Sequence, residues 1–294
     1  MRITVTGAGG LIGAKLVERL RARGDDVTTL SRNPSSPGAV AWQPADEPAP
    51  AAAQAGRDAV VHLAGEPVAQ RWSDAAKRRI RSSRELGTRN LVAGIEAADP
   101  RPRALVSSSA VGYYGPHGDE RLDENTPAGS DFLAEVCVTW EREARRAEEL
   151  GLRVVTVRTG VVLAPGGGAL AKMLPFFKLC VGGPVAGGSQ YMPWIHVDDV
   201  VGIYLAALDG EDWNGPVNAS APEPVTNKAF SKALGRALRR PAFAPVPGLA
   251  VRALYGEMAE IVTTGQRVVP RRAQELGYAF GYTDLDAALR SALE

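Results

Sequence analysis

The first twenty residues, MRITVTGAGGLIGAKLVERL (residues 1–20), decide the fold. The β-branched run from Ile3 to Val5 predicts a short strand, and the glycine-rich stretch after it predicts a tight turn. From residue 11 to residue 23 the apolar residues recur at helical spacing, and Gly24 ends the pattern. A glycine turn between a strand and a helix can bring bare backbone N–H groups to a phosphate at the start of the helix.

The turn itself reads Thr6-Gly7-Ala8-Gly9-Gly10-Leu11-Ile12-Gly13 and fits the pattern T-G-x-x-G-x-x-G. Gly7 permits the sharp bend, Gly10 removes a side chain from beneath the phosphates, and Gly13 lets the helix pack on the sheet. Because the motif follows a strand and opens an amphipathic helix, it predicts a dinucleotide site and not a chance glycine turn. We expect the cofactor to contact Thr6, Gly7, Gly10, Leu11, Ile12 and Gly13.

The end of the next strand, Val27 to Leu30, indicates which dinucleotide binds. An NAD site would place Asp or Glu there for the ribose hydroxyls, but this chain has Ser31-Arg32-Asn33. Arg32 can pair with a 2′-phosphate and Ser31 can donate to it, so we predict NADP(H). The alternative is that Arg32 is a solvated loop residue.

The rest of the chain alternates between strand and helix patterns. The apolar run from Ala59 to Leu63 predicts a strand buried on both faces, and helices are expected over 77–97 and from Asp131 to Gly151. This order predicts an α/β fold: a Rossmann-type, doubly wound parallel sheet with a smaller carboxy-terminal substrate lobe. We assign residues 1–220 to the NADP-binding domain, with 160–197 contributing to the substrate side, and residues 221–294 to the lobe.

Composition narrows the class of protein. The 294 residues include 34 Lys plus Arg and 33 Asp plus Glu, a net charge of +1, so we expect neither a nucleic acid nor a membrane as partner. Two cysteines and three histidines suggest neither a disulfide framework nor a metal site. The amino terminus lacks the pattern of a signal peptide, and no segment is apolar enough to span a membrane. We therefore expect a soluble, cytoplasmic protein.

Further segments resemble a known family. AVVHLAGE (59–66), SSSAVGYYG (107–115) and PWIHVDD (193–199), together with the glycine turn, resemble the extended short-chain dehydrogenase/reductases of the nucleotide-sugar epimerase kind. EPVAQRW (66–72), SSRELGT (82–88), FLAEVCVTWE (132–141), RTGVVL (158–163) and the tail resemble one atypical subgroup. Its members are NAD(P)-dependent epimerase-family proteins with a carboxy-terminal domain of unknown function, some of which carry the label cell-division inhibitor. The resemblance covers nearly the whole chain.

The resemblance implies further cofactor contacts. Leu63, Ala64 and Gly65 would pass beneath the adenine ribose, and Arg84 would reach the cofactor from the following helix. Gly160 and Val161 would lie near the nicotinamide end. For Arg84, a solvated charge on a helix surface is the alternative. The resemblance also implies a small-molecule substrate and is compatible with a homodimer.

The usual catalytic pair of the family is missing. None of the seven tyrosines is followed by Lys in a Tyr-x-x-x-Lys arrangement, and the resemblance puts Leu133 and Cys137 at those two positions. Ser109 matches the family serine that holds the substrate carbonyl. Tyr113 and Tyr114 are candidate proton donors, if their pKa is lowered.

Other residues near these motifs have weaker claims. Glu66 and His196 are further candidate acids, although an isolated histidine is more often structural, and apolar neighbours favour an inert core thiol at Cys137. We interpret Asp198 and Asp199 as helix caps. The aromatic and apolar residues that could line a substrate pocket, or simply pack, are Trp72, Tyr191, Met192 and Trp194.

Two functions follow from these observations. The first is an NADP-dependent oxidoreductase acting on a small carbonyl or hydroxyl compound, with epimerisation or dehydration through a transient oxidised intermediate as a variant. The second is a non-catalytic NADP(H)-binding redox sensor or regulatory protein, which the missing Tyr-x-x-x-Lys pair favours.

Overall fold

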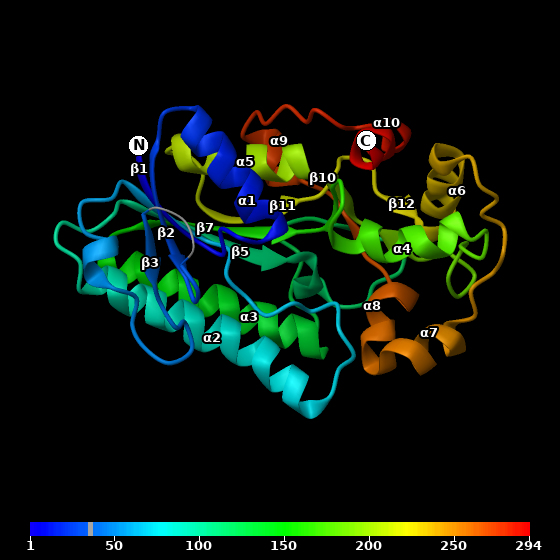
Figure 1. Cartoon of the computed structure of the whole chain (residues 1–294), viewed down its shortest axis with the longest axis horizontal. Coiled ribbons are helices and arrows are strands. Elements are labelled where there is room, and N and C mark those ends of the chain that lie inside the picture. The colour runs from blue at the N-terminus through cyan, green and yellow to red at the C-terminus, as the bar shows by residue number, and fades with distance from the viewer. Residues whose placement is uncertain (35–37) are drawn as a thin grey trace.

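The computed structural model describes residues 1–34 and 38–294. At its centre lies a seven-stranded sheet in which all neighbouring strands run parallel (Figure 1). In spatial order the strands are β11 (Gly215–Ala219), β7 (Arg153–Thr159), β5 (Ala104–Ala110), β4 (Ala59–His62), β1 (Arg2–Thr6), β2 (Asp26–Ser31) and β3 (Ala39–Ala41). The chain builds outward from β1 to β3 and then outward from β4 to β11, so the sheet is doubly wound. The predicted Rossmann-type fold is confirmed.

Two pairs of helices cover the two faces of this sheet. Helices α1 (Leu11–Ala22) and α5 (Val197–Asp209) share one core with the upper face in Figure 1. Helices α2 (Asp74–Glu96) and α3 (Phe132–Arg145) cover the lower face, where α2 contributes Leu91 and Ile95 to a second core. Within the two described ranges, no helix is long and apolar enough to cross a membrane.

Capping side chains set the ends of the helices on the lower face. Ser73 accepts a hydrogen bond from the amide of Ala76 at 3.2 Å, so α2 begins three residues before the predicted start. Asp131 accepts from Ala134 N at 2.8 Å at the start of α3. The 3₁₀ turn η3 (Arg146–Leu150) continues α3 to a left-handed Gly151.

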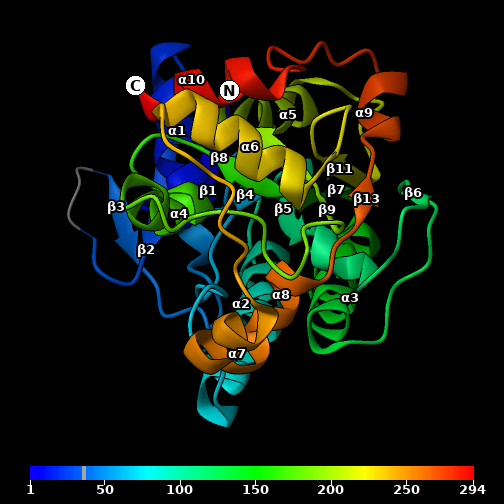
Figure 2. The ribbon, with the colours of Figure 1, turned by 90° about the vertical axis from the view of Figure 1, so that its right-hand side faces the viewer.

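The smaller lobe is built from two separate stretches of chain. Its elements are β8 (Val161–Leu163), α4 (Gly168–Lys178), β9 (Tyr191–Met192), β10 (Trp194–His196), β12 (Val225–Thr226), α6 (Asn227–Leu238), α7 (Gly248–Tyr255), η4 (Gly256–Ala259), α8 (Glu260–Thr263) and α10 (Leu285–Leu293). Strand β10 pairs with β8, and β12 with β9. One hydrophobic core joins residues from 163–194 with residues from 221–292. Figure 2, in which the lobe faces the viewer, shows α4, α6 and α7.

The chain then returns from the lobe to the first domain. Of three further short elements, η1 (Ala51–Ala53) contributes Ala53 to the second core, while η2 (Val111–Tyr114) and β6 (Arg121–Leu122) share a small core of their own. Strand β13 (Arg267–Val268) pairs with β6, and α9 (Arg271–Glu275) packs against β11. Ala273 of α9 is completely buried in the core beneath α1 and α5. The tail of the chain therefore completes the core that its first residues begin.

The sequence predicts Asp198 and Asp199 as caps of α5, but neither of them caps this helix. His196 is the cap, and its Nδ1 accepts from the amide of Asp198 at 3.2 Å. The Asp198 carboxylate pairs with Lys15 at 2.8 Å. Asp199 instead accepts from the amides of residues 281 and 282, at 2.7 and 2.9 Å, and so fastens the tail. The prediction was wrong because a cap is set by the backbone conformation at the helix start, which composition does not reveal.

Candidate functional site

The glycine turn forms a cradle at the start of α1. Gly7 has a φ of +70°, and a Cβ there would lie 2.6 Å from the carbonyl carbon of Leu63. A Cβ on Gly13 would lie 2.2 Å from the carbonyl oxygen of Gly7. Gly10 caps the helix without a side chain, and the first turn (residues 11–14) contains no acidic residue. The N–H groups and the positive end of the helix dipole thus suit an anion such as a pyrophosphate.

A buried polar chain ties this cradle to the neighbouring strand. Thr6 Oγ1 accepts from the amides of Leu63 and Ala64 at 3.2 and 3.3 Å, which leaves its own proton for His62 Nδ1 at 2.7 Å. On its other side His62 Nε2 lies 3.0 Å from the hydroxyl of Thr88 in α2. Burial, and then the nearby charge of Arg84, lower the pKa of His62 to about 3. The imidazole is therefore neutral and supports the segment that was predicted to pass beneath the ribose.

The sequence alone did not identify His62 as a residue that supports the cofactor cradle. It lies at the end of an otherwise apolar strand, and that contrast is the only signal it gives. Its partners stand 56 and 26 residues away, so no local pattern connects them.

Arg84 lies beside the segment from Leu63 to Gly65. Its Nη1 donates to the carbonyl oxygens of Glu66 and Ile80 at 3.0 and 3.2 Å, and its guanidinium stands 4.8 Å from the Trp140 ring centre. A Cβ on Gly65 would lie 3.3 Å from the Arg84 Cζ, so the glycine makes room for the guanidinium. Arg84 is thus partly enclosed next to the cradle and is not a solvated surface charge.

Ser31 and Arg32 lie level with the glycine turn. Leu30 is paired with Thr6 in the sheet, so the two following residues stand beside Gly7 at the carboxyl edge. Ser31 Oγ accepts from the amide of Asn33 at 3.2 Å. The Arg32 side chain is exposed and forms no ion pair with any residue in the described ranges. A guanidinium is therefore available where the sequence places the 2′-phosphate.

Gly160 and Val161 link the carboxyl end of β7 to the smaller lobe. Gly160 N donates to Ala219 O at 2.9 Å, and Val161 N donates to Pro193 O at 2.7 Å. A Cβ on Gly160 would lie 2.3 Å from that same Pro193 oxygen. The glycine is therefore required where the two parts of the chain meet, at the same edge of the sheet as the cradle.

Ser109 belongs to a buried network of three elements. Its hydroxyl donates to Glu141 Oε1 at 2.7 Å, from β5 to α3. Arg158 of β7 donates to both oxygens of the same carboxylate, at 2.8 and 2.9 Å. Burial lowers the pKa of Arg158, but its hydrogen bonds and charge interaction with Glu141 outweigh this and raise it. The Arg158 guanidinium is therefore held charged beside Glu141, and the single proton of Ser109 is already engaged.

The two candidate tyrosines have different surroundings. Tyr114 is completely buried, donates to Asn218 Oδ1 at 2.7 Å and accepts from Arg158 Nη1 at 3.1 Å. Burial raises the pKa of Tyr114 to about 12. Tyr113 is only half buried, and its ring lies 3.4 Å from the Arg158 guanidinium. The geometry thus favours Tyr113 over Tyr114 as a group that can reach a substrate.

Leu133 and Cys137 lie together against the turn after β5. A Cβ on Gly112 would lie 3.3 Å from Leu133 Cβ and 3.9 Å from Cys137 Sγ. Burial, reinforced by the charge of Glu141, raises the pKa of the Cys137 thiol to about 12. These positions therefore supply neither a phenol nor a cation.

The two remaining candidate acids, His196 and Glu66, are engaged in other contacts. His196 is buried, stacks on Tyr282 with ring centres 3.8 Å apart, and has its pKa lowered by burial. Glu66 Oε1 accepts from Gln70 at 3.2 Å. Within residues 1–34 and 38–294 we find no group of three or more His, Cys, Asp or Glu that could hold a metal ion.

The four residues considered as a pocket lining divide into two pairs. Trp194 and Met192 belong to the core of the lobe. Trp72 and Tyr191 are half buried, and Trp72 packs edge-on against Phe132 with ring centres 5.1 Å apart. Only the second pair can thus contribute to an accessible surface.

Comparisons with known proteins show the family of this chain. Residues 3–219 match the NAD dependent epimerase/dehydratase family, and residues 246–292 match a domain of unknown function, DUF1731. The chain is 43% identical over 306 residues to the chloroplastic epimerase family protein SDR39U1 homolog of Arabidopsis thaliana, covering 100% of this chain and 87% of the relative. It is 40% identical over 295 residues to the human epimerase family protein SDR39U1, covering 99% of each.

Solved structures agree as well. A crystal structure of human SDR39U1 (isoform 2) with NADPH superposes with a TM-score of 0.92, at 38% identity and 99% coverage of both chains. A nucleoside-diphosphate sugar epimerase from Corynebacterium glutamicum gives a TM-score of 0.83 at 35% identity, over 100% of this chain and 58% of that one. From its glycine turn to the end of β11, the chain belongs to the NAD dependent epimerase/dehydratase family.

Proposed function

We propose that this protein binds NADP(H) at the carboxyl edge of the sheet and acts as an atypical oxidoreductase on a small carbonyl or hydroxyl compound. The observation that carries the proposal is the glycine-lined start of α1, which has no side-chain cap and therefore fits a pyrophosphate. The NADPH in the crystal structure of the human relative supports the same cofactor here.

The choice of NADP(H) over NAD(H) rests on the end of β2. Arg32 offers an exposed guanidinium without a carboxylate partner in the described chain, and Ser31 offers a hydroxyl beside it. An NAD site would need a carboxylate at this level, which would repel a 2′-phosphate. Arg84, Leu63, Ala64 and Gly65 would hold the ribose side of the cofactor.

When bound, the cofactor supplies or accepts the hydride, and the residues of this chain must hold the substrate oxygen and move a proton. Ser109 already donates to Glu141, so its oxygen lone pairs remain for a group that donates. A substrate hydroxyl is such a group. Tyr113 would carry the proton, because Tyr114 is buried and its hydroxyl is already bonded to two partners.

The test has two steps. NADPH and NADH are titrated against the protein by fluorescence, and reduction of NADP+ is then followed with a panel of hydroxyl compounds, the class that can donate to Ser109. We expect selective NADPH binding, turnover on at least one compound, and loss of that turnover in Ser109→Ala with binding retained. Ser107→Ala is the matched control, since Ser107 is a buried serine of the same strand that donates only to a backbone oxygen. Failure to bind NADPH would overturn the proposal.

One observation supports the second function, a non-catalytic NADP(H)-binding sensor. Leu133 and Cys137 occupy the positions at which the family resemblance places tyrosine and lysine, and both contact the turn after β5. Such a protein would bind NADPH as tightly as the enzyme. It would show no turnover on any compound, and Ser109→Ala would then change nothing that the assay measures.

A further inference from the structure

The exposed apolar side chains gather in one part of the chain. Of the large apolar residues that are exposed in the described ranges, only Met1 lies outside residues 176–261. Leu249 and Leu254 of this group lie in α7, and three others, Phe243, Leu179 and Val181, lie in loops with 82%, 73% and 54% of their surface accessible. Their two segments touch, because a Cβ on Gly183 would lie 2.0 Å from the carbonyl oxygen of Ala244. Monomeric soluble proteins rarely concentrate such side chains without a partner for them.

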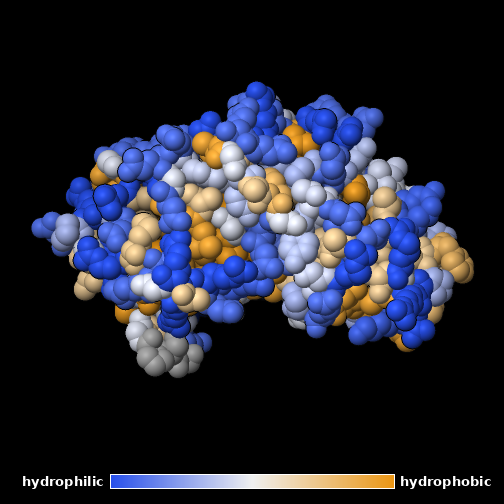
Figure 3. Space-filling view, turned by 90° about the horizontal axis from the view of Figure 1, so that it is seen from above, coloured by the Kyte–Doolittle hydropathy of each residue, from blue (hydrophilic) through white to orange (hydrophobic). Residues whose placement is uncertain are grey.

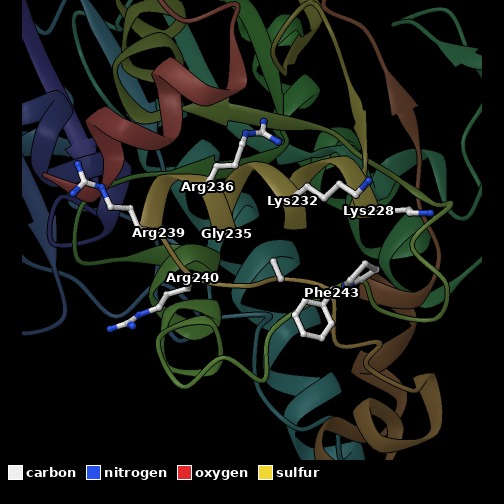
Figure 4. Close-up of a pocket in the computed structure, with 9 residues that line it drawn as sticks. Lys228, Lys232, Gly235, Arg236, Arg239, Arg240 and Phe243 are labelled. Carbon is white, nitrogen blue, oxygen red and sulfur yellow. The ribbon is translucent and has the colours of Figure 1, made fainter.

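Cations lie around one of these apolar side chains, Phe243. A hollow of about 520 Å³ between α6 and the segment after it is lined by Lys228, Lys232, Arg236, Arg239, Arg240 and Phe243 (Figure 4). Figure 4 shows Phe243 across the hollow from Lys228 and Lys232. Figure 3 shows hydrophilic and hydrophobic residues side by side at the right-hand end of the molecule. We call Lys228, Lys232, Arg239, Arg240, Phe243, Leu179 and Val181 the basic face.

Most of these cations have no counter-charge. Arg236 pairs with Asp286 at 2.8 Å, whereas the other four form no ion pair with any residue of the described ranges. Lys228, Lys232 and Arg236 recur every four residues, so they form one row on the exposed side of α6. We expected no membrane partner because the net charge of the chain is only +1. That sum does not reveal this row of cations, because acidic residues elsewhere in the chain offset its charge.

Helix stability alone does not account for this arrangement. Arg239 and Arg240 follow the end of α6, where cations are favourable, but Lys228 lies in its first turn, where the helix dipole disfavours a cation. Arg239 also adopts a left-handed φ of +54°, a conformation that glycine or asparagine usually supplies at a helix end. Both placements cost stability, and neither side chain forms an ion pair in the described ranges that would offset the cost.

We propose that the basic face docks on the surface of an anionic lipid bilayer. The apolar side chains project separately from two loops, and a bilayer accepts such side chains one by one among its headgroups. A folded protein partner would need a matching pocket for each. The unpaired cations complement anionic headgroups, and each one near such a surface strengthens binding. The proposal is independent of whether the protein binds NADPH.

The experiment is cosedimentation of the whole protein with large vesicles of phosphatidylcholine and phosphatidylserine, in about a two-to-one ratio, and with vesicles of phosphatidylcholine alone. We expect binding only to the mixed vesicles, weakened by added salt. Lys228→Glu/Lys232→Glu should reduce the partition coefficient at least about tenfold, because four units of charge change next to the membrane. Phe243→Ser should reduce it about fivefold or more, and Phe243→Trp should restore it.

The matched control is Arg21→Glu/Arg78→Glu, which makes the same change in total charge at exposed positions on α1 and α2. This variant should bind mixed vesicles nearly as well as the wild type. Equal loss in both double variants would reveal non-specific attraction and overturn the proposal, as would failure of the wild type to bind. Binding of a polyglutamate peptide at this face without vesicle binding would assign it to an acidic protein and also overturn the proposal.

Discussion

Acidification should unfold this protein partly through one buried histidine. His62 has a pKa of about 3 in the folded chain, against about 6.5 in an unfolded one. Because the folded pKa is the lower of the two, the unfolded chain binds the proton first. The stability that depends on a neutral His62 is therefore complete above about pH 6.5 and is lost progressively as the pH falls toward 3.

The size of the effect follows from proton linkage. Each pH unit in this window costs about 1.4 kcal/mol per proton, so His62 alone should cost about 2.5 kcal/mol between about pH 6 and about pH 4. The measurement is urea unfolding of the wild type and of His62→Gln at both pH values. Carboxylates titrate in both proteins, so the difference between the two losses isolates the histidine.

The wild type should lose about 2.5 kcal/mol more than His62→Gln over this interval. His117→Gln is the control, since it removes a partly exposed histidine and leaves His62 in place. Equal losses in the wild type and His62→Gln would mean that His62 accepts a proton within the fold. The neutral chain from Thr6 through His62 to Thr88 would then be refuted.

Three further predictions concern Arg32, Glu141 and the two cysteines. Arg32→Ala should raise the dissociation constant for NADPH by about 10- to 100-fold while leaving that for NADH nearly unchanged in fluorescence titrations, and an unchanged ratio would sink the NADP assignment. Glu141→Gln should lower the free energy of unfolding by about 3–5 kcal/mol in urea, because it leaves the buried Arg158 without its carboxylate; a loss below about 1 kcal/mol would contradict the ion pair. A thiol reagent should modify the exposed Cys180 rapidly and the buried Cys137 only after unfolding, so rapid reaction of both in the native protein would contradict the packing against Gly112.

The features that the sequence predicted are those with a local signal. The glycine turn, the buried strand at residues 59–63 and the alternation of strand and helix depend on neighbouring residues, and the structure has all three. Helix ends were displaced by a few residues because Ser73 supplies a cap that the apolar pattern does not record. The dinucleotide cradle was predictable for the same reason, since one continuous stretch contains it.

The catalytic neighbourhood was less accessible to prediction, because it depends on contacts between distant residues. Ser109, Glu141 and Arg158 come from three elements and meet only when the sheet and α3 are assembled. Tyr113 and Tyr114 are equivalent in the sequence, whereas the turn η2 turns their rings to 83° from one another and buries only one completely. Adjacent residues thus reach opposite surroundings through a backbone turn that composition does not specify.

The return of the tail to the first domain has a consequence for synthesis. The chain emerges from the ribosome amino terminus first. All seven sheet strands are therefore outside the ribosome before Ala273 and the residues bound by Asp199 have emerged. Until those last residues arrive, the apolar surface that Ala273 covers beside α5 stays open to water or to a chaperone. The core beside α5 therefore remains incomplete until these residues have been synthesised, although the sheet strands are already present. A premature stop within α9 would leave an aggregation-prone product and not a shorter working domain.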